Sequence, residues 1–309
     1  MEAGVPQGSN LGPLFFLVFF NDLAFSVKSS VDSYADDTTV TAVGKSAEII
    51  ESRLTNDCSS ICRWMECNKL KMNLEKTHIM TMGTQKRLSK GIKPLEVVIG
   101  DVIIREDRSK CETLLGCKIF NNMKWEYQVR ALESKLSLRL NGLSHLRWVC
   151  SFQLRKKFAE GLFNSVLTYC LPVFGGLEIG QLDRIQVLQN KVARLVLNAP
   201  PRAKRTEMFT RLKWFTVNQL ICYHSLITVF KVKKNRDPDY LARILCWENR
   251  NGKIIIPHQT LTLSARSFCF RGGNQWNKLP IGLRTSSSIS TFKKGLKTWV
   301  FENTPQFLN

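Results

Sequence analysis

Apolar and polar residues repeat with several periods along the first 120 residues, and each period predicts a different element. Residues 46–67 are typical of an amphipathic helix packed on a sheet, because their apolar side chains recur at helical spacing. These side chains are Ile50, Leu54, Cys58, Ile61 and Met65. Residues 77–82 alternate in a strand-like period, residues 97–104 favour a hairpin, and residues 114–119 favour a further strand.

The beginning of the chain combines a glycine-rich stretch with a strongly apolar one. Residues 4–13 read GVPQGSNLGP, and residues 14–20 are all apolar. Pro13 suits a first helical turn, so we expect a buried helix after a glycine loop. Residues 31–41, VDSYADDTTVT, place residues that suit extended backbone on both sides of Asp36 and Asp37, which predicts a hairpin with two carboxylates at its tip.

From Trp125 onward the pattern is helical. Three apolar stripes predict three helices, and Lys and Arg residues dominate the opposite faces. The stripes are Val129, Leu132, Leu136, Leu140 and Leu143; Leu154, Phe158, Leu162 and Val166; and Leu182, Ile185, Val192 and Leu195. Pro200 and Pro201 end the third helix, and a further helix is expected at 216–234. The sequence therefore predicts an α+β part followed by a helical part.

The charge is distributed unevenly between the two halves of the chain. The chain carries a formal charge of +20, and residues 151–309 hold 25 Lys and Arg residues against 8 Asp and Glu residues. Residues 1–42 hold five acidic residues and a single base, Lys28. This asymmetry is typical of a protein that holds cations at one place and a polyanion, such as nucleic acid, at another. A generally basic surface is the alternative.

The cysteines and the apolar run exclude several classes of protein. The ten cysteines form no CxxC pair, which argues against zinc fingers, and most of them are expected to be buried in a reducing compartment. Residues 14–20 are too few to span a membrane. We therefore expect an intracellular protein without a membrane segment, and the sequence leaves nuclear or cytoplasmic residence open.

Asp36 and Asp37 are the first candidates for chemistry. Two adjacent carboxylates repel each other and titrate as a coupled pair, so their most favourable partner is a divalent cation that prefers oxygen ligands, Mg²⁺ or Mn²⁺. The alternative is a solvated turn, because Asp-Asp is also common in turns.

The order of the motifs resembles the reverse transcriptases of non-long-terminal-repeat retrotransposons, most like the jockey-type group. The motifs are GVPQGSNLGP, an apolar helix, YADD, an amphipathic helix, NKLKMNLEKT, LLGCKI, a basic helical region, and RSFCFRGGNQWNKLP with TFKKGLKTW near the end. The resemblance runs from residue 4 to the end. It implies a partial right-hand palm at 1–122, with an antiparallel sheet and packed helices, a helical thumb at 123–200 and a basic C-terminal region at 201–309.

The resemblance also implies two-metal nucleotidyl transfer, with an RNA template, a DNA primer and deoxynucleoside triphosphates as partners. By the family's motifs, Asp36 and Asp37 are the catalytic ligands of Mg²⁺ or Mn²⁺, and Lys76 is the lysine that protonates or neutralises pyrophosphate. The residues that match template- or nucleotide-binding positions are Gln7, Gly8, Tyr34 and Ala35. Leu115 and Gly116 match the start of the primer grip.

In the family, the first metal-binding aspartate lies upstream of the PQG loop, whereas Gly4 is the fourth residue here. Asp22 and Asp32 do not lie in the expected strand context. We therefore expect the isolated chain to bind divalent metal weakly at most and to show no template-directed extension. Two alternatives stay open: a non-catalytic nucleic-acid-binding protein that uses the basic half, and a degraded element product without function.

Overall fold

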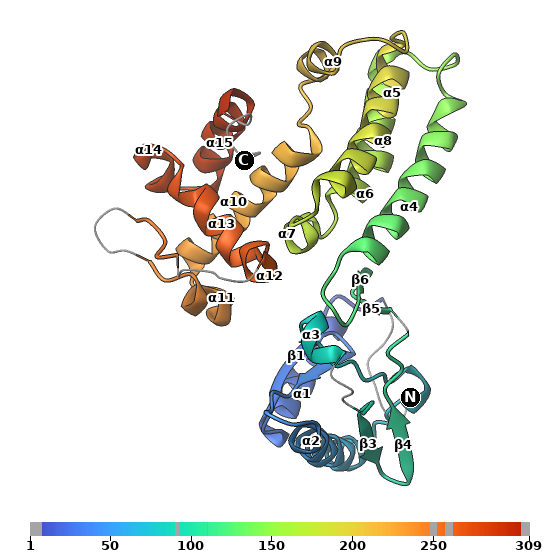
Figure 1. Ribbon diagram of the computed structural model, residues 1–309, viewed down its shortest axis with the longest axis vertical. Coiled ribbons are helices and arrows are strands. Elements are labelled where there is room, and N and C mark those ends of the chain that lie inside the picture. Colours follow the sequence, from blue (N-terminus) through green and yellow to red (C-terminus); the bar gives the residue numbers. More distant parts are fainter. Residues whose placement is uncertain (1–7, 90–92, 110, 248–251, 257–261, 304–309) are drawn as a thin grey trace. The chain divides into compact units, whose positions relative to one another are not determined.

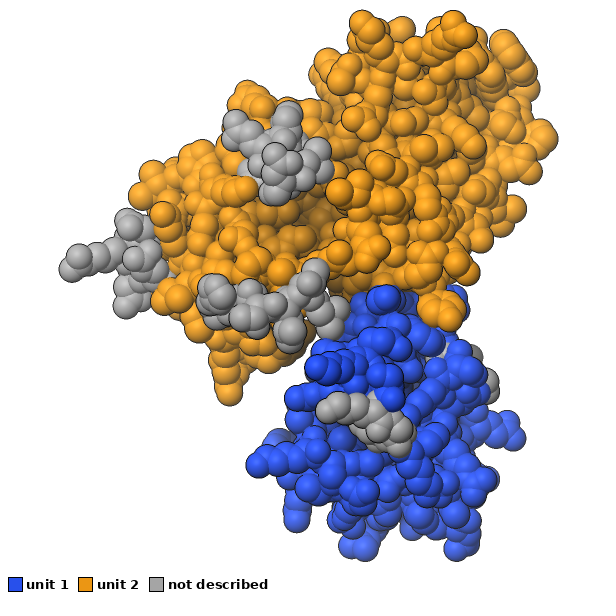
Figure 2. Space-filling model, in the orientation of Figure 1, with its two compact units in different colours: residues 1–124 blue, residues 125–309 orange. Residues whose placement is uncertain are grey.

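The computed structural model describes residues 8–89, 93–109, 111–247, 252–256 and 262–303. The chain divides into two compact units, residues 1–124 and residues 125–309 (Figure 2). The structure thus combines a mixed unit, which contains strands and helices, with a helical unit.

Unit 1 joins helices to short antiparallel hairpins, as the α+β expectation requires (Figure 1). Its described elements are α1 (Gly12–Phe20), η1 (Asn21–Ser26), β1 (Ser30–Tyr34), β2 (Asp37–Thr41), α2 (Ala47–Cys67), η2 (Leu74–Lys76), α3 (Gln85–Leu88), β3 (Glu96–Ile99), β4 (Val102–Arg105), β5 (Glu112–Leu114) and β6 (Cys117–Ile119). The strands pair in sequence order, β1 with β2, β3 with β4 and β5 with β6.

The helix α2 is central to unit 1, because it packs against both a helical segment and a strand. It contacts η1 and β3, and its Ile61 is buried with Phe20 and Leu23 in one apolar cluster. Val40 of β2 packs against the same cluster. The amphipathic helix and the hairpin at 97–104 are both confirmed.

The apolar helix α1 exists, but the expectation that it is buried is wrong. Five of its large apolar side chains are 41–68 % exposed: Leu14, Phe15, Leu17, Val18 and Phe19. The buried Phe20 stacks on Phe16 and meets the edge of Trp64 of α2. A nine-residue helix that is apolar on most sides buries only the side that faces its neighbour, and within the described residues that neighbour is α2.

Two strand predictions also need correction. Residues 77–82 form no strand, and the one among them with a side-chain acceptor is Thr81, whose N–H donates to Glu106 Oε1 at 2.6 Å. Residues 114–119 belong to a hairpin and not to one strand. Leu115 (φ 47°) and Gly116 (φ 76°) form its turn, and positive φ at both central residues is typical of two-residue hairpins.

Unit 2 is built of helices throughout its described regular elements (Figure 1). They are α4 (Glu126–Ser144), α5 (Phe152–Phe158), η3 (Ala159–Asn164), α6 (Ser165–Thr168), α7 (Leu171–Phe174), α8 (Ile179–Leu197), α9 (Arg205–Leu212), α10 (Val217–Asn235), α11 (Asp239–Ile244), α12 (Thr262–Ala265), α13 (Phe268–Asn277), α14 (Ile281–Arg284) and α15 (Ile289–Asn303). The helices α4 and α8 pack against each other, and α10 packs against α13 and α15.

The core of unit 2 follows most of the predicted stripes. Val129, Leu132, Leu136 and Leu143 are buried on α4, as predicted, and Trp276 is fully buried where α10, α13 and α15 meet. The expected helix at 216–234 is confirmed as α10, whose N-cap Thr216 accepts a hydrogen bond from Gln219 N.

The second predicted stripe is wrong by one residue. Leu154, Phe158 and Leu162 are 41–48 % exposed, whereas Ala159, Phe163 and Leu167 are buried. Arg155 lies on the packed side because its guanidinium donates to the carbonyl groups of Arg147, Cys150 and Val196. A charged side chain thus lies on the packed side, where it binds carbonyl groups of the α4–α5 connection and of α8.

All ten cysteines are free, but only Cys117 and Cys222 are buried. The expectation that most of them are buried is therefore wrong. No helix among the described residues combines the length and the apolar character that a membrane crossing requires.

Candidate metal and nucleic-acid site

The acidic hairpin forms as predicted, with a two-residue turn at Ala35 and Asp36. Tyr34 pairs with Asp37 and Asp32 pairs with Thr39 across the two strands. Ala35 adopts the left-handed conformation, with φ 53°, which costs energy for a residue other than glycine. Asp36 thus lies in the turn itself, and Asp37 is the first residue of β2.

The two faces of this hairpin have different surroundings. Side chains alternate along each strand, so the register places Asp32, Tyr34 and Asp37 on one face and Val40 on the other. Val40 packs against the core of unit 1, whereas Tyr34 is 70 % exposed and both aspartates of the turn are exposed. The core therefore holds the hairpin by its apolar face and leaves the acidic face accessible.

A buried aspartate on α2 fixes the start of β1. The carboxylate of Asp57, which is 4 % exposed, accepts hydrogen bonds from the backbone N–H groups of Lys28 (2.9 Å) and Ser29 (3.2 Å). This positioning residue was missed in the sequence. Its signal was visible, because Asp57 lies three residues after Leu54 and four before Ile61, on the apolar face of the helix.

The two carboxylates at the tip supply part of the oxygen ligands that a Mg²⁺ ion needs. Among the described residues there is no group of three or more His, Cys, Asp or Glu side chains that would enclose a metal ion. Mg²⁺ is usually bound by one or two carboxylates, with waters and substrate phosphates as the other ligands. An exposed pair of aspartates matches that kind of site and not a closed protein cage.

The predicted site residues outside the acidic hairpin belong to other segments of unit 1. Lys76 ends η2 and is exposed, and within the described residues no hydrogen bond or ion pair joins it to Asp36 or Asp37. Gly8 has φ 82°, and no atom lies within 4 Å of the position of an added Cβ. Leu115 and Gly116 form the turn between β5 and β6. Gln7 lies outside the described residues.

Comparison with known proteins shows what the chain is similar to. Residues 1–141 match the sequence model described as reverse transcriptase (RNA-dependent DNA polymerase). The chain is 28 % identical over 263 residues to a probable RNA-directed DNA polymerase from transposon BS, and 25 % identical over 256 residues to the RNA-directed DNA polymerase from mobile element jockey, both of Drosophila melanogaster. Residues 1–141 are therefore similar to reverse transcriptases, and the relatives that the chain resembles over most of its length are RNA-directed DNA polymerases of mobile elements.

The alignments with these relatives cover most of this chain but only a small part of each relative. Each of the two alignments covers 79 % of the chain, but 28 % and 27 % of the respective relatives. The chain thus spans less than a third of their length. Reverse transcriptases use divalent metal ions, a nucleic-acid template and primer, and nucleotide substrates. No solved structure is significantly similar to the chain.

Proposed function

We propose that this chain forms the part of an RNA-directed DNA polymerase that carries the acidic hairpin, with Asp36 and Asp37 as ligands of the catalytic Mg²⁺ or Mn²⁺. The observation that carries the proposal is the two-residue turn that exposes the YADD carboxylates within the segment matched to reverse transcriptases. The apolar face of the hairpin, anchored through Val40 on the core, supports it.

The proposal assigns the palm to residues 1–122, the thumb to 123–200 and an additional C-terminal region to 201–309. Its partners are an RNA template, a DNA primer and deoxynucleoside triphosphates. We assign contacts with the template or the incoming nucleotide to Gln7, Gly8, Tyr34 and Ala35, and contacts with the primer to Leu115 and Gly116. The exposed ring of Tyr34, beside Asp37 on the same face, suits such a contact.

The chemistry follows from the donor types. When bound, the metal ions activate the primer hydroxyl and stabilise charge on the transferring phosphate. Asp36 and Asp37 supply anionic oxygen ligands that are exposed. Among the described residues, no Lys or Arg side chain forms an ion pair with either of them. Lys76, an exposed ammonium group, donates a proton to the departing pyrophosphate or neutralises its charge.

Manganese binding tests the proposal. We expect Asp36→Asn in the full chain to weaken Mn²⁺ binding, measured by electron paramagnetic resonance, by about tenfold or more, because a charged oxygen ligand is lost. The matched control is Asp101→Asn, which removes an exposed aspartate from the turn between β3 and β4 and should leave the binding unchanged.

Equal Mn²⁺ affinity of Asp36→Asn and Asp101→Asn would contradict a metal site at the YADD turn. If the same two variants also retained full binding to an RNA–DNA duplex, the non-catalytic nucleic-acid-binding function would be favoured. The charge of residues 151–309 is the observation that supports that second candidate.

A further inference from the structure

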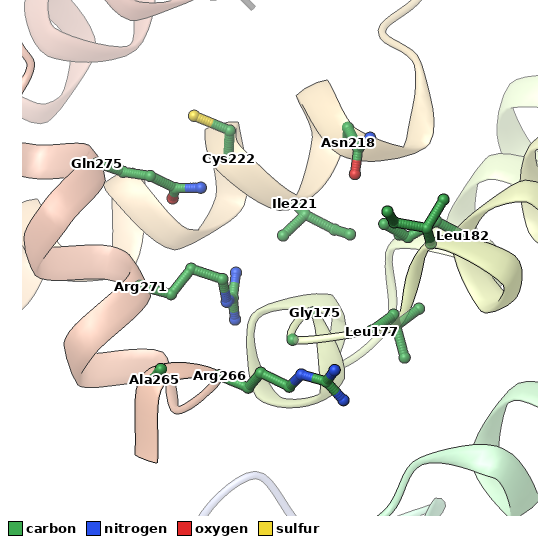
Figure 3. A pocket seen from close by; sticks show the side chains of 12 residues that line it. Gly175, Leu177, Leu182, Asn218, Ile221, Cys222, Ala265, Arg266, Arg271 and Gln275 are labelled. Atoms are coloured by element: carbon green, nitrogen blue, oxygen red, sulfur yellow. The ribbon is translucent and has the colours of Figure 1, made fainter. Parts of the chain in front are cut away.

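Unit 2 contains a cavity of about 260 Å³ that the proposed polymerase site does not use (Figure 3). It lies among the loop between α7 and α8, the start of α10, and the segment from α12 to α13. Its volume falls just below the range of pockets for drug-sized ligands, about 300–1,000 Å³. The space therefore suits a small chemical group.

One cation that lines this cavity has no acidic partner among the residues that the structure describes. Figure 3 shows the Arg271 guanidinium reaching from α13 toward Gly175. It donates from one terminal nitrogen to Ser225 Oγ (3.1 Å) and from the other to the Pro172 carbonyl (2.9 Å), while its buried Nε has no hydrogen-bond partner. Among the described residues Arg271 forms no ion pair.

The other charged or ionisable groups of the lining do not neutralise Arg271. None of the lining residues is an Asp or a Glu, and Arg266 at the edge is itself paired with Glu178 at 2.8 Å. Burial raises the pKa of the Cys222 thiol to about 12, so this thiol stays neutral. Burial lowers the pKa of Arg271 to about 10, which leaves the guanidinium charged at neutral pH.

A second polar group beside Arg271 has unmet hydrogen-bonding capacity. Gln275 lies one helical turn further along α13, its amide points toward the cavity, and its buried Oε1 has no partner (Figure 3). A partly buried cation without an acidic partner and a buried amide oxygen without a hydrogen-bond donor are both costly. A ligand that carries anionic oxygens together with a hydroxyl group would satisfy both, whereas a carboxylate has no proton to donate at neutral pH.

We propose that this cavity binds a phosphate group, with Arg271 donating to its anionic oxygens and Gln275 accepting from its P–OH. The proposal goes beyond the polymerase function and does not depend on it. The phosphate comes either from free inorganic phosphate or from the 5′ end of an RNA strand. Guanidinium groups are well matched to phosphate oxygens, since they present several donors in a fixed fork.

Calorimetric titration of the full chain with inorganic phosphate at constant ionic strength tests the proposal. We expect saturable binding that sulfate and acetate do not match. Arg271→Gln should weaken it by about tenfold or more, the value of a lost charge-assisted hydrogen bond. The control Arg243→Gln removes an equal charge from an exposed arginine that is paired with Asp239 on α11 and should leave phosphate binding unchanged.

Because Arg271 also ties α13 to α10, a second pair of variants leaves its hydrogen bonds intact. Ile179 lies at the edge of the cavity and is 76 % exposed. Ile179→Glu places a competing carboxylate there and should weaken phosphate binding, whereas the neutral Ile179→Gln should not. Equal affinities in this pair, equal binding of phosphate, sulfate and acetate, or no saturable binding would each overturn the proposal.

The source of the phosphate is decided with a short RNA that carries either a 5′-phosphate or a 5′-hydroxyl group. Stronger binding of the phosphorylated strand, lost in Arg271→Gln, supports the strand end as ligand. Binding of inorganic phosphate without any preference between the strands supports free phosphate. Neither titration involves Asp36 or Asp37, so a failure here is distinguishable from a failure of the metal-site proposal.

Discussion

At the scale of the residue, Asp57 is a contact of the acidic hairpin that lies outside it, on α2. Its buried carboxylate accepts hydrogen bonds from the two backbone N–H groups of Lys28 and Ser29, directly before β1. An ionised acceptor makes stronger hydrogen bonds than a neutral one, so this contact fixes the chain immediately before the strand that leads to Asp36. The segment that leads into β1 is thus held by a helix far from it in sequence.

We expect Asp57→Asn to loosen the start of β1, because an amide accepts less strongly and presents donors to the two N–H groups. Hydrogen exchange measured by mass spectrometry should show the Lys28 and Ser29 amides exchanging about tenfold faster or more. The control is Glu66→Gln, an exposed position on the same helix. Unchanged exchange in Asp57→Asn would mean that other contacts hold this segment.

Residue patterns identified the hairpin because its rules are local. Asp-Asp favours a turn and the flanking Val, Ser and Thr residues favour strands, so the places of Asp36 and Asp37 in the hairpin were predictable. The role of Arg271 was not predictable from the sequence. It depends on which side chains surround the cavity, and these come from elements that meet only in the folded unit. The functions assigned to the nine predicted site residues remain predictions.

Among the elements, those with a packed partner followed the sequence pattern most closely. The stripe of α4 is buried against α8 and the apolar face of α2 lies on β3. The pattern failed where a local contact decided the outcome. Positive φ at Leu115 and Gly116 turned one expected strand into a hairpin. After α5 the buried side chains are those of η3 and α6, one residue further along than expected.

A charge network joins α4 to α8, and its effect on stability depends on pH. Hydrogen bonds from Arg184, Arg130 and Gln181 lower the pKa of Glu126 from 4.5 to about 2. A carboxylate with a lowered pKa stabilises the folded state above its unfolded pKa, and this contribution disappears as the pH falls toward the folded value. The relevant window is therefore between about pH 4.5 and about pH 2.

We expect Glu126→Gln to lower the free energy of unfolding of the full chain near neutral pH by less than about 1 kcal/mol, because the pair is partly exposed and screened. The difference from the wild type should shrink as the pH is lowered through that window. Urea unfolding followed by circular dichroism at several pH values measures it. A difference that stays constant down to about pH 2 would contradict the role of Glu126.

At the scale of the whole molecule, the chain combines an acidic hairpin in one unit with most of the positive charge in the other. Residues 151–309 carry 25 of the 45 Lys and Arg residues and only 8 of the 25 acidic residues. Some of these bases are already engaged within the protein, such as Arg184 with Glu126 and Glu133. The bases that remain exposed are available to phosphates.

Salt titration measures how many phosphates the full chain contacts. Each neutralised phosphate contributes about −0.9 to the slope of log affinity against log salt concentration on duplex DNA. If the chain contacts four phosphates or more, the slope should be about −3.6 or steeper. A slope near zero in fluorescence anisotropy would contradict nucleic-acid binding by the basic half.

The exposed apolar side chains of α1 have a consequence for how copies of the protein behave together. A charge of +20 keeps copies apart by mutual repulsion in dilute buffer. At about 1 M salt the Debye length falls to about 3 Å, so Phe15, Leu17 and Val18 of different copies are free to meet. The salt that releases nucleic acid should therefore promote clustering of the released protein, and purification has a bounded range of ionic strength.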